Sequence, residues 1–303
     1  MIYRKKMRAM FDFRMETFLK VCETLHYTKA AQQLGLTQPA VSQHIHFLED
    51  AYGVKLFTYR AKKLTLTAAG ELLREYALTR RHDDAFLREK LAGAAAGRKT
   101  LSFGATLTIA EFVLPKRLAA YLKEASPARL KLTVANTGRL LKQLDAGALD
   151  MALVEGYFSR QKYASLTYAR ERYIAVCAPQ HPLSGRPAGL EELLPERLLL
   201  REKGSGTREI LEKHLEACSL SIEDFAGVAE IGDIRTIKQL AMQNCGVCFL
   251  YEAAVRDELK AGLLKEIPLR GMSITHDFSF IWRKGSLYAQ EYTAVFEALK
   301  NTP

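Results

Sequence analysis

The stretch "LGLTQPAVSQHIHFLED", Leu34 to Asp50, combines a helical apolar pattern with short polar side chains, and it decides the fold of the N-terminal part. Thr37 can cap a helix there, and Pro39 falls in the first turn, where a missing N–H group costs nothing. On a helical projection one face is apolar and is predicted to pack against a core: Val41, Ile45 and Leu48. The opposite face carries Pro39, Gln43 and His46, flanked by Gln38 and Ser42.

The preceding residues predict two further helices. Apolar residues at helical spacing predict a helix over about residues 15–26, and Thr28 is expected to cap the short helix "KAAQQL", which ends at Gly35. The order is helix, short turn, helix. Short amide and hydroxyl side chains suit the major groove of DNA, where glutamine can read adenine and serine can reach bases or phosphates. The alternative is a helical hairpin with a polar face toward solvent.

The residues after Gly53, "VKLFTYRAKKLTLTAAG", favour DNA binding over that alternative. A short apolar run, a basic turn and the alternating "LTLT" predict a two-stranded wing whose basic tip can straddle the phosphate backbone. Thr67 is then expected to cap a long helix. A helix-turn-helix followed by a basic wing is a more specific signal than either half. The basic residues of the turn are Arg60, Lys62 and Lys63.

The net charge of +10 is concentrated at the N-terminal end. Residues 1–70 carry 11 Lys and Arg against five Asp and Glu, whereas the other 233 residues carry 33 against 29. A basic first quarter is expected of a part that meets a polyanion. The 303 residues suffice for two domains. Since no long apolar run and no secretory signal is present, no membrane contact is predicted and the cytoplasm is the expected compartment.

Residues 28–70 resemble the winged helix-turn-helix of LysR-type transcriptional regulators. They contain paired alanines, "TQPAVS", Leu-Glu, Gly-x-x-Leu-Phe-x-Arg and Leu-Thr-x-x-Gly at the family's spacing, and the resemblance continues through the chain. It implies a homodimer or homotetramer on two-fold related half-sites of double-stranded DNA. It also implies a C-terminal domain that senses a small-molecule effector, and it allows contact with RNA polymerase.

Carried over by matching position, the resemblance makes Gln38, Pro39, Ser42 and Gln43 the groove contacts and Arg60 and Thr65 the wing contacts. The full candidate set also contains Thr37, His46, Lys62 and Lys63. The family often has a basic residue after the serine, where this chain has Gln43, which is expected to change the preferred bases. Family members usually start near Phe13, so residues 1–14 are interpreted as an extra arm.

Residues 68–97 have no proline and predict a helix of about 25 residues that ends in the hinge "GAAAG". The helix has an apolar stripe that needs a partner: Leu72, Leu73, Tyr76, Phe86, Leu87 and Leu91. In the family that partner is the same helix of a second chain, and the alternative is packing on the chain's own effector domain.

From Lys99 onward, strands alternate with helices, which predicts an α/β domain with parallel sheets and helices on both faces. The resemblance implies two lobes similar to periplasmic binding proteins, with the last strand and helix returning to the first lobe. The predicted division is a winged helix-turn-helix at 15–72, a linker and hinge at 73–97 and an effector domain at 98–303. Within that domain, lobe I covers 98–170 and 270–303, and lobe II covers 171–269.

Three loops are expected to converge on the cleft between the lobes: the loop after the first strand, "GSGTR", and "EIGDIRT" at residues 230–236. The loop after the first strand and "GSGTR", residues 204–208, offer backbone N–H groups, hydroxyls and a guanidinium, which suit a small anion. The alternative role for these residues is helix capping. The candidate effector-binding residues are Thr106, Thr108, Asn136, Gly204, Ser205, Gly206, Thr207, Arg208 and Asp233. An anion that closes the cleft is expected to shift the paired linker helices and so alter half-site spacing or DNA bending.

The sequence predicts no enzyme, metal site or cofactor. It shows no nucleophile–base pair, and its seven histidines are scattered without a close pair near carboxylates. Of the five cysteines, Cys245 and Cys248 have redox spacing and are interpreted as small buried thiols. The alternative is a regulator switched by oxidation of this pair.

Overall fold

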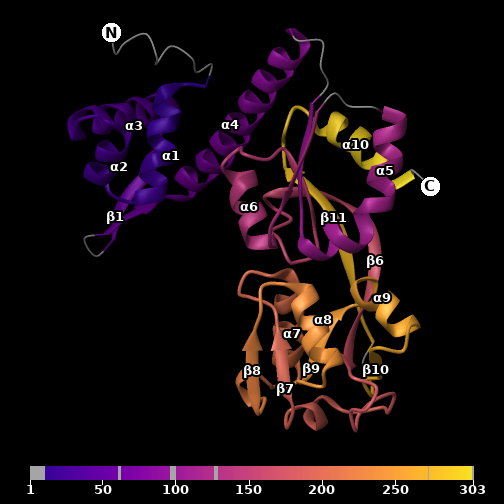
Figure 1. Ribbon diagram of the computed structural model, residues 1–303. Helices are drawn as coiled ribbons and strands as arrows, with labels where there is room; N and C mark the ends of the chain where they lie inside the picture. The colour runs from indigo at the N-terminus through magenta and orange to yellow at the C-terminus, as the bar shows by residue number, and fades with distance from the viewer. Residues whose placement is uncertain (1–10, 61–62, 96–99, 126–128, 272, 302–303) are drawn as a thin grey trace.

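The computed structural model describes residues 11–60, 63–95, 100–125, 129–271 and 273–301 (Figure 1). The N-terminal domain contains the predicted helix-turn-helix and wing. Its elements are α1 (Phe13–Thr24), α2 (Tyr27–Leu34), α3 (Gln38–Tyr52), β1 (Phe57–Arg60) and β2 (Lys63–Leu66). β1 and β2 pair antiparallel, as a wing requires.

Two helix starts differ from the prediction because other residues cap them. α1 begins two residues early, at Phe13, since the Asp12 carboxylate accepts the N–H of Arg14 at 2.7 Å. α2 begins at Tyr27, capped by the ring of His26, so the assignment of Thr28 as its cap is wrong. The predicted Thr37 cap of α3 is confirmed.

A buried carboxylate joins α3 to the wing. Glu49 lies beside Leu48 on the core face of α3 and accepts the Leu56 N–H at 2.9 Å and the Lys55 ammonium at 2.6 Å. Burial acts to raise the pKa of Glu49, but these two hydrogen bonds outweigh it and hold the pKa below its ordinary value. The ionised carboxylate is therefore part of the folded N-terminal domain.

The linker helix α4 (Ala68–Ala95) starts as predicted, with the Thr67 hydroxyl accepting the Gly70 N–H at 3.0 Å. Its middle packs on the chain's own effector domain, where Phe86 lies 4.5 Å from the Tyr288 ring. The prediction that the whole apolar stripe meets a second chain is therefore wrong for Phe86. Part of the predicted hinge, residues 96–97, lies outside the described residues.

Lobe I is built on three parallel strands, β3 (Thr100–Ala105), β4 (Arg129–Val134) and β5 (Met151–Val154). Lobe II is built on β7 (Arg197–Leu200), β8 (Gly227–Glu230) and β9 (Val247–Tyr251), also parallel. The long antiparallel strands β6 (Tyr163–Cys177) and β11 (Ile274–Arg283) join the two parts, and β10 (Lys265–Ile267) pairs with β6. The single sheet is therefore mixed, in the order β4-β3-β5-β11-β6-β9-β7-β8.

Helices cover both lobes, and Figure 1 shows the two lobes one above the other. Those of lobe I are the π-helical turn η2 (Ile109–Val113), α5 (Leu114–Ala125), α6 (Thr137–Asp145) and α10 (Ala289–Asn301). Those of lobe II are α7 (Gly206–Ala217), α8 (Ile234–Met242), α9 (Glu252–Lys260) and the short turns η3 (Leu190–Leu193) and η4 (Ile222–Asp224). The predicted return of the chain to lobe I is confirmed, since β11 pairs with β5.

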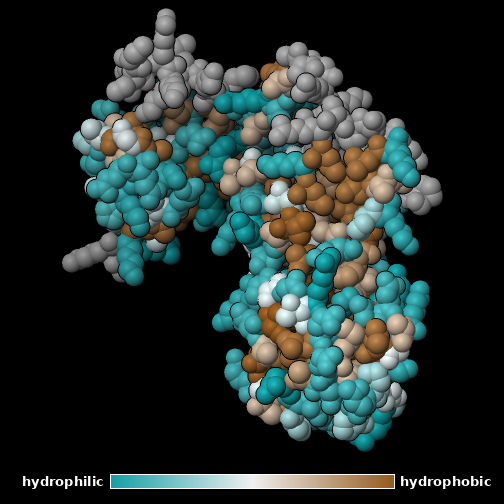
Figure 2. All heavy atoms as spheres, in the orientation of Figure 1, coloured by the Kyte–Doolittle hydropathy of each residue, from teal (hydrophilic) through white to brown (hydrophobic). Residues whose placement is uncertain are grey.

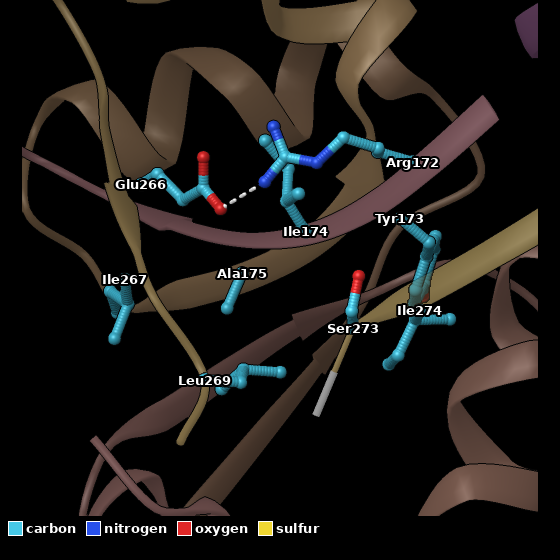
Figure 3. Close-up of a pocket in the computed structure, with 9 residues that line it drawn as sticks. All are labelled: Arg172, Tyr173, Ile174, Ala175, Glu266, Ile267, Leu269, Ser273 and Ile274. Carbon is cyan, nitrogen blue, oxygen red and sulfur yellow. Dashed lines mark hydrogen bonds and ion pairs between the residues drawn. The ribbon is translucent and has the colours of Figure 1, made fainter. Parts of the chain in front are cut away.

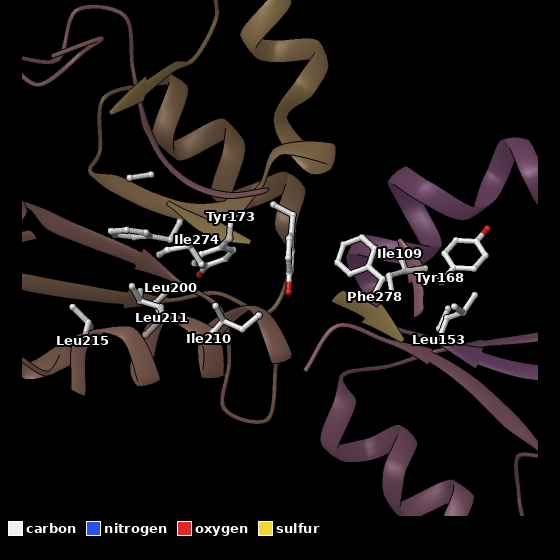
Figure 4. Packing of buried hydrophobic residues seen from close by; sticks show 14 of the residues in the cluster. Ile109, Leu153, Tyr168, Tyr173, Leu200, Ile210, Leu211, Leu215, Ile274 and Phe278 are labelled. Carbon is white, nitrogen blue, oxygen red and sulfur yellow. The ribbon is translucent and has the colours of Figure 1, made fainter. Parts of the chain in front are cut away.

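One large cluster of buried apolar side chains extends through both lobes, and Figure 4 shows two groups of its members. One group contains Ile109, Leu153 and Phe278, and the other contains Leu200 and Ile210. β6 and β11 run from one group to the other, and their register shifts at Phe278/Ser279. Of the helices that the structure describes, none is both long and apolar enough to span a membrane.

We expect Glu49→Gln to destabilise the N-terminal domain by about 1–3 kcal/mol at neutral pH, because the amide loses the charge-assisted contact with Lys55. A lowered pKa adds stability above the ordinary pKa of a glutamate, and that stability is lost as the pH falls through the lowered value. The difference between native protein and variant should therefore shrink in acid. Urea unfolding at several pH values measures it, with the exposed Asp50→Asn on the same helix as control. A difference that stays constant with pH would contradict the assignment.

Candidate DNA-binding surface and interlobe polar cluster

The predicted recognition face of α3 lies on the protein surface. Gln38, Pro39, Gln43 and His46 are exposed and Ser42 is partly exposed, while Val41 and Ile45 are buried on the opposite face. Figure 2 shows a mainly hydrophilic surface on the visible side of the N-terminal domain. The Thr37 hydroxyl accepts the N–H of Ala40 at 3.3 Å and so also fixes the start of the helix.

The wing carries its basic side chains at the end farthest from the core. Arg60 and Lys63 are direct partners across the two strands and both are exposed, whereas Lys62 lies outside the described residues. Thr65 donates its hydroxyl to the Thr58 carbonyl oxygen at 3.3 Å, so this side chain also holds the wing together. Sequence reasoning missed Tyr59, which is 68% exposed beside Arg60; the in–out alternation of the strand could not have indicated it, because Tyr59 lies two residues from the buried Phe57.

An apolar groove of about 630 Å³ lies where α4 leaves the N-terminal domain. Leu72 of α4 is 75% exposed and Tyr76, one turn further along, is 54% exposed. Tyr52 and Val54, at the end of α3, form the facing wall and are also about half exposed. This end of the predicted apolar stripe is therefore not covered by the chain's own described residues.

The second group of candidate residues meets where the lobes touch. Five buried polar atoms there have no hydrogen-bond partner among the described residues: Thr106 Oγ1, Thr137 Oγ1, Glu155 Oε2, Arg201 Nη1 and Ser205 Oγ. Each of these five side chains is at most 3% exposed. Together with Thr108 and Thr207 we call them the interlobe polar cluster. Unpaired buried polar atoms are rare in folded proteins, so their concentration in one place makes the interlobe polar cluster a candidate binding site.

Glu155 lies at the centre of the cluster. It follows β5 in lobe I, and its Oε1 accepts the hydroxyl of Thr207, the second residue of α7 in lobe II, at 2.9 Å. Burial raises the pKa of Glu155, while the hydroxyls of Thr108 and Thr207 and the Arg201 guanidinium act in the opposite direction. Sequence reasoning missed Glu155 and Arg201, although each directly follows a strand that points at the cleft.

The two lobes are in direct contact around the cluster. The Gly138 N–H donates to the Gly204 carbonyl oxygen at 3.2 Å, and the Asn136 amide donates to Glu202 Oε1 at 3.2 Å. Gly206 lies so close to lobe I that a Cβ atom on it would be 2.6 Å from the Gly156 Cα atom. The predicted residues Asn136, Gly204 and Gly206 thus all lie at the junction between the lobes.

The N-termini of two helices meet at this junction, one from each lobe. Asn136 caps α6 through its own side chain, whereas the Ser205 hydroxyl makes no capping bond to α7. Free N–H groups and the positive end of the helix dipole favour a negative charge at such a place.

Two candidate residues have other roles in this structure. The Arg208 guanidinium forms ion pairs with Glu212 at 2.7 Å and Glu230 at 2.6 Å, both in lobe II, and its Nη1 donates to the Arg201 carbonyl oxygen at 3.3 Å, so its charge is already paired beside the cluster. Asp233 is exposed and caps α8 by accepting the Thr236 N–H at 2.7 Å. Helix capping by Asp233 is the alternative role that the sequence left open, whereas the ion pairs of Arg208 were not predicted.

A separate small cavity lies between β6, β10 and the start of β11 (Figure 3). Its volume is about 40 Å³, and the ion pair between Arg172 and Glu266, 2.6 Å long, lies beside it. A volume of this size holds about one water molecule. It is therefore too small for an effector.

The cysteine pair does not support a thiol switch. Cys248 is fully buried on β9, and burial raises the pKa of its thiol well above the ordinary value, which disfavours the reactive thiolate. Cys245 is partly exposed and unbonded to another cysteine. The interpretation as small buried thiols agrees with the geometry of Cys248 and is wrong for Cys245, which lies partly exposed just before β9.

Comparison with known proteins agrees with this architecture. Residues 13–71 match the family "Bacterial regulatory helix-turn-helix protein, lysR family", and residues 94–302 match "LysR substrate binding domain". The chain is 30% identical over 290 residues to the transcriptional regulator CbbR of Rhodospirillum rubrum, covering 95% of each protein. It is 27% identical over 273 residues to the transcriptional regulator CysL of Bacillus subtilis, and the match covers 88% of this chain and 89% of CysL.

The solved structure of a mutant of OxyR from Corynebacterium glutamicum has the same fold, with a TM-score of 0.61 and 23% identity over 96% of this chain and 91% of that one. A winged helix-turn-helix joined by a long helix to a two-lobed domain defines a transcriptional regulator that binds DNA and an effector. The chain belongs to the LysR family of these regulators.

We expect Gly206→Ala to force the lobes apart, because its Cβ atom would meet the backbone of Gly156 rather than a movable side chain. The cost should be about 1–3 kcal/mol of unfolding free energy, as for other overpacked sites. Urea unfolding and small-angle X-ray scattering would measure the loss of stability and a larger radius of gyration. Gly232→Ala in the same lobe is the control, since its Cβ atom would meet only a side-chain oxygen at 3.9 Å. An unchanged radius in the Gly206 variant would show that the lobes do not depend on this contact.

Proposed function

We propose that this regulator acts in the cytoplasm as a homodimer that binds two-fold related DNA half-sites. α3 would enter the major groove with Gln38, Ser42 and Gln43 toward the bases, and Arg60 and Lys63 of the wing would contact phosphates. The exposure of this polar face, opposite a buried apolar face, supports the assignment. The same assignment includes Lys62 and His46 as further contacts.

We further propose that the groove at the base of α4 is the dimer contact. Leu72 and Tyr76 are large apolar side chains with more than half of their surface exposed, which is costly for a monomer. The same groove on a second chain offers a matching surface, as a two-fold contact requires. Two such dimers would form the tetramer that the family resemblance allows.

The effector is proposed to be a small anion held by the interlobe polar cluster. The single observation that carries this assignment is the set of buried hydroxyls and the Arg201 Nη1 atom without partners among the described residues, beside the N-termini of α6 and α7. Arg201 takes the role that the sequence assigned to Arg208. An anion that holds the lobes together would change the spacing of the two DNA-binding domains through α4, and so the half-site spacing or the bend of the DNA.

The effector assignment is tested by thermal unfolding of the full-length protein with phosphate, sulfate, sulfite and small carboxylates. An anion that fits should raise the melting temperature, and Arg201→Met should remove the effect. Arg197→Met, an exposed arginine of the same lobe, is the control and should leave it unchanged. If every anion acted equally on native protein and on the Arg201 variant, the cluster would not be the effector site.

For DNA binding, we expect Gln43→Ala to cost about 1–3 kcal/mol on the operator and little on random DNA, because a base contact is lost. Lys63→Ala should instead weaken binding to both DNAs alike, because a phosphate contact carries no sequence information. Fluorescence anisotropy with the two DNAs at fixed salt measures both. Equal losses for Gln43→Ala on the two DNAs would show that Gln43 does not read bases.

For assembly, we expect Leu72→Asp to weaken the dimer by about 1.5–3 kcal/mol or more, the value of burying one leucine side chain. Sedimentation velocity over a range of protein concentrations gives the dissociation constant. The control is Leu263→Asp, a half-exposed leucine on lobe II, far along the chain from α4. A dimer as stable as the native one would place the contact elsewhere.

A further inference from the structure

Glu155 is an acid in a cluster whose other members can all donate hydrogen bonds. Its Oε1 accepts from Thr207, while Oε2 makes no hydrogen bond of normal geometry with the residues that the structure describes, although the hydroxyls of Thr106 and Thr108 lie near enough to lower the pKa of the carboxyl. The side chain is 1% exposed, so water does not compensate for the missing partner as it would on the surface. An anion bound by the neighbouring donors would lie against this oxygen.

The charges of the cluster do not suit an anion unless a proton is present. Arg201 is already paired with Glu202 through two contacts of 2.8 and 3.1 Å. With Glu155 ionised, two carboxylates would face one guanidinium, and an entering anion would be repelled at short range in a buried place. One proton between Glu155 and the anion turns this repulsion into a hydrogen bond.

The two tyrosine hydroxyls near Glu155 cannot take up or release this proton. The Tyr251 hydroxyl donates to the carbonyl oxygen of Glu155 at 3.2 Å, and the Tyr173 hydroxyl donates to the carbonyl oxygen of Thr207 at 2.8 Å. Burial keeps the pKa of both phenols well above their ordinary value, so both stay neutral. The proton therefore belongs to Glu155 or to the anion itself.

We propose that the effector is an oxyanion that shares one proton with Glu155, and that this carboxylate selects oxyanions carrying an O–H group. Such an anion brings the proton, and its O–H donates to Glu155 Oε2. A fully deprotonated oxyanion binds only if Glu155 first takes up one proton from solvent, which then forms the same hydrogen bond. This inference rests on the proposed anion site and adds the class of anion to it.

Inorganic phosphate and sulfate test the proposal because they have nearly the same size and shape. Phosphate keeps an O–H group between about pH 7 and 9, whereas sulfate carries none. By isothermal titration of full-length protein, we expect phosphate to bind at least about tenfold more tightly than sulfate at neutral pH. The affinity for sulfate should fall about tenfold for each further pH unit, while that for phosphate falls less.

Glu155→Gln is the informative variant, since its amide keeps an acceptor for Thr207 and can donate to any oxyanion. It should bind sulfate at least as well as phosphate, with no proton uptake in buffers of different ionisation enthalpy. Glu209→Gln is the matched control, because Glu209 also bridges the lobes by accepting the Tyr157 N–H at 3.3 Å. It should change both affinities equally.

The outcomes separate the two proposals. If native protein binds neither anion, the proposed anion site fails. The shared proton is wrong if native protein binds both anions with the same pH dependence. It is also wrong if Glu155→Gln abolishes binding of both anions or keeps the native preference. In these cases the anion site itself is judged by the thermal unfolding experiment alone.

Discussion

One buried arginine makes a central contact between the linker helix and the effector domain. Arg283, at the end of β11, is 1% exposed and lies between Glu75 of the linker helix, at 3.0 Å, and Asp145 at the end of α6, at 2.7 Å. A buried charge of this kind is stable only with its partners in place. The linker helix is therefore fixed on lobe I rather than free beside it.

The same helix α6 reaches both sites that matter for regulation. It begins at the interlobe polar cluster with Asn136 and Thr137 and ends at Asp145 beside the linker helix. Nine residues of helix are a stiff connection between these two ends. The geometry thus gives the effector domain a direct physical link to α4, and α4 carries the winged helix-turn-helix.

As a proposed anion site, the interlobe polar cluster is unusual because it contains a carboxylate. Hydroxyls, a guanidinium and two helix N-termini favour negative charge, whereas Glu155 disfavours it unless it shares a proton. The close approach of Gly156 and Gly206 lets these groups from two lobes meet, since any side chain there would separate them. Selectivity would follow from the balance of these opposite charges rather than from the shape of a pocket alone.

The sequence by itself determined the local elements and the surface that we propose to meet DNA. Periodicity and capping residues predicted α3, its buried Val41 and Ile45 and its exposed Gln43, because these depend on residues close together in the chain. The wing, the long helix and the α/β character of the effector domain followed from the same kind of local pattern. The small errors at α1 and α2 arose where Asp12 and His26, rather than a threonine, supplied the cap.

Only the tertiary structure decided which side chains of the effector domain share a site. Arg208 was the cation predicted from its motif, but it lies on α7 and pairs with Glu230 of β8, a contact that no local pattern shows. Glu155 and Arg201 belong to different lobes, so their meeting depends on how β6 and β11 set one lobe against the other. For the same reason Phe86 packs on Tyr288 while Leu72 stays exposed, although both belong to one helical stripe.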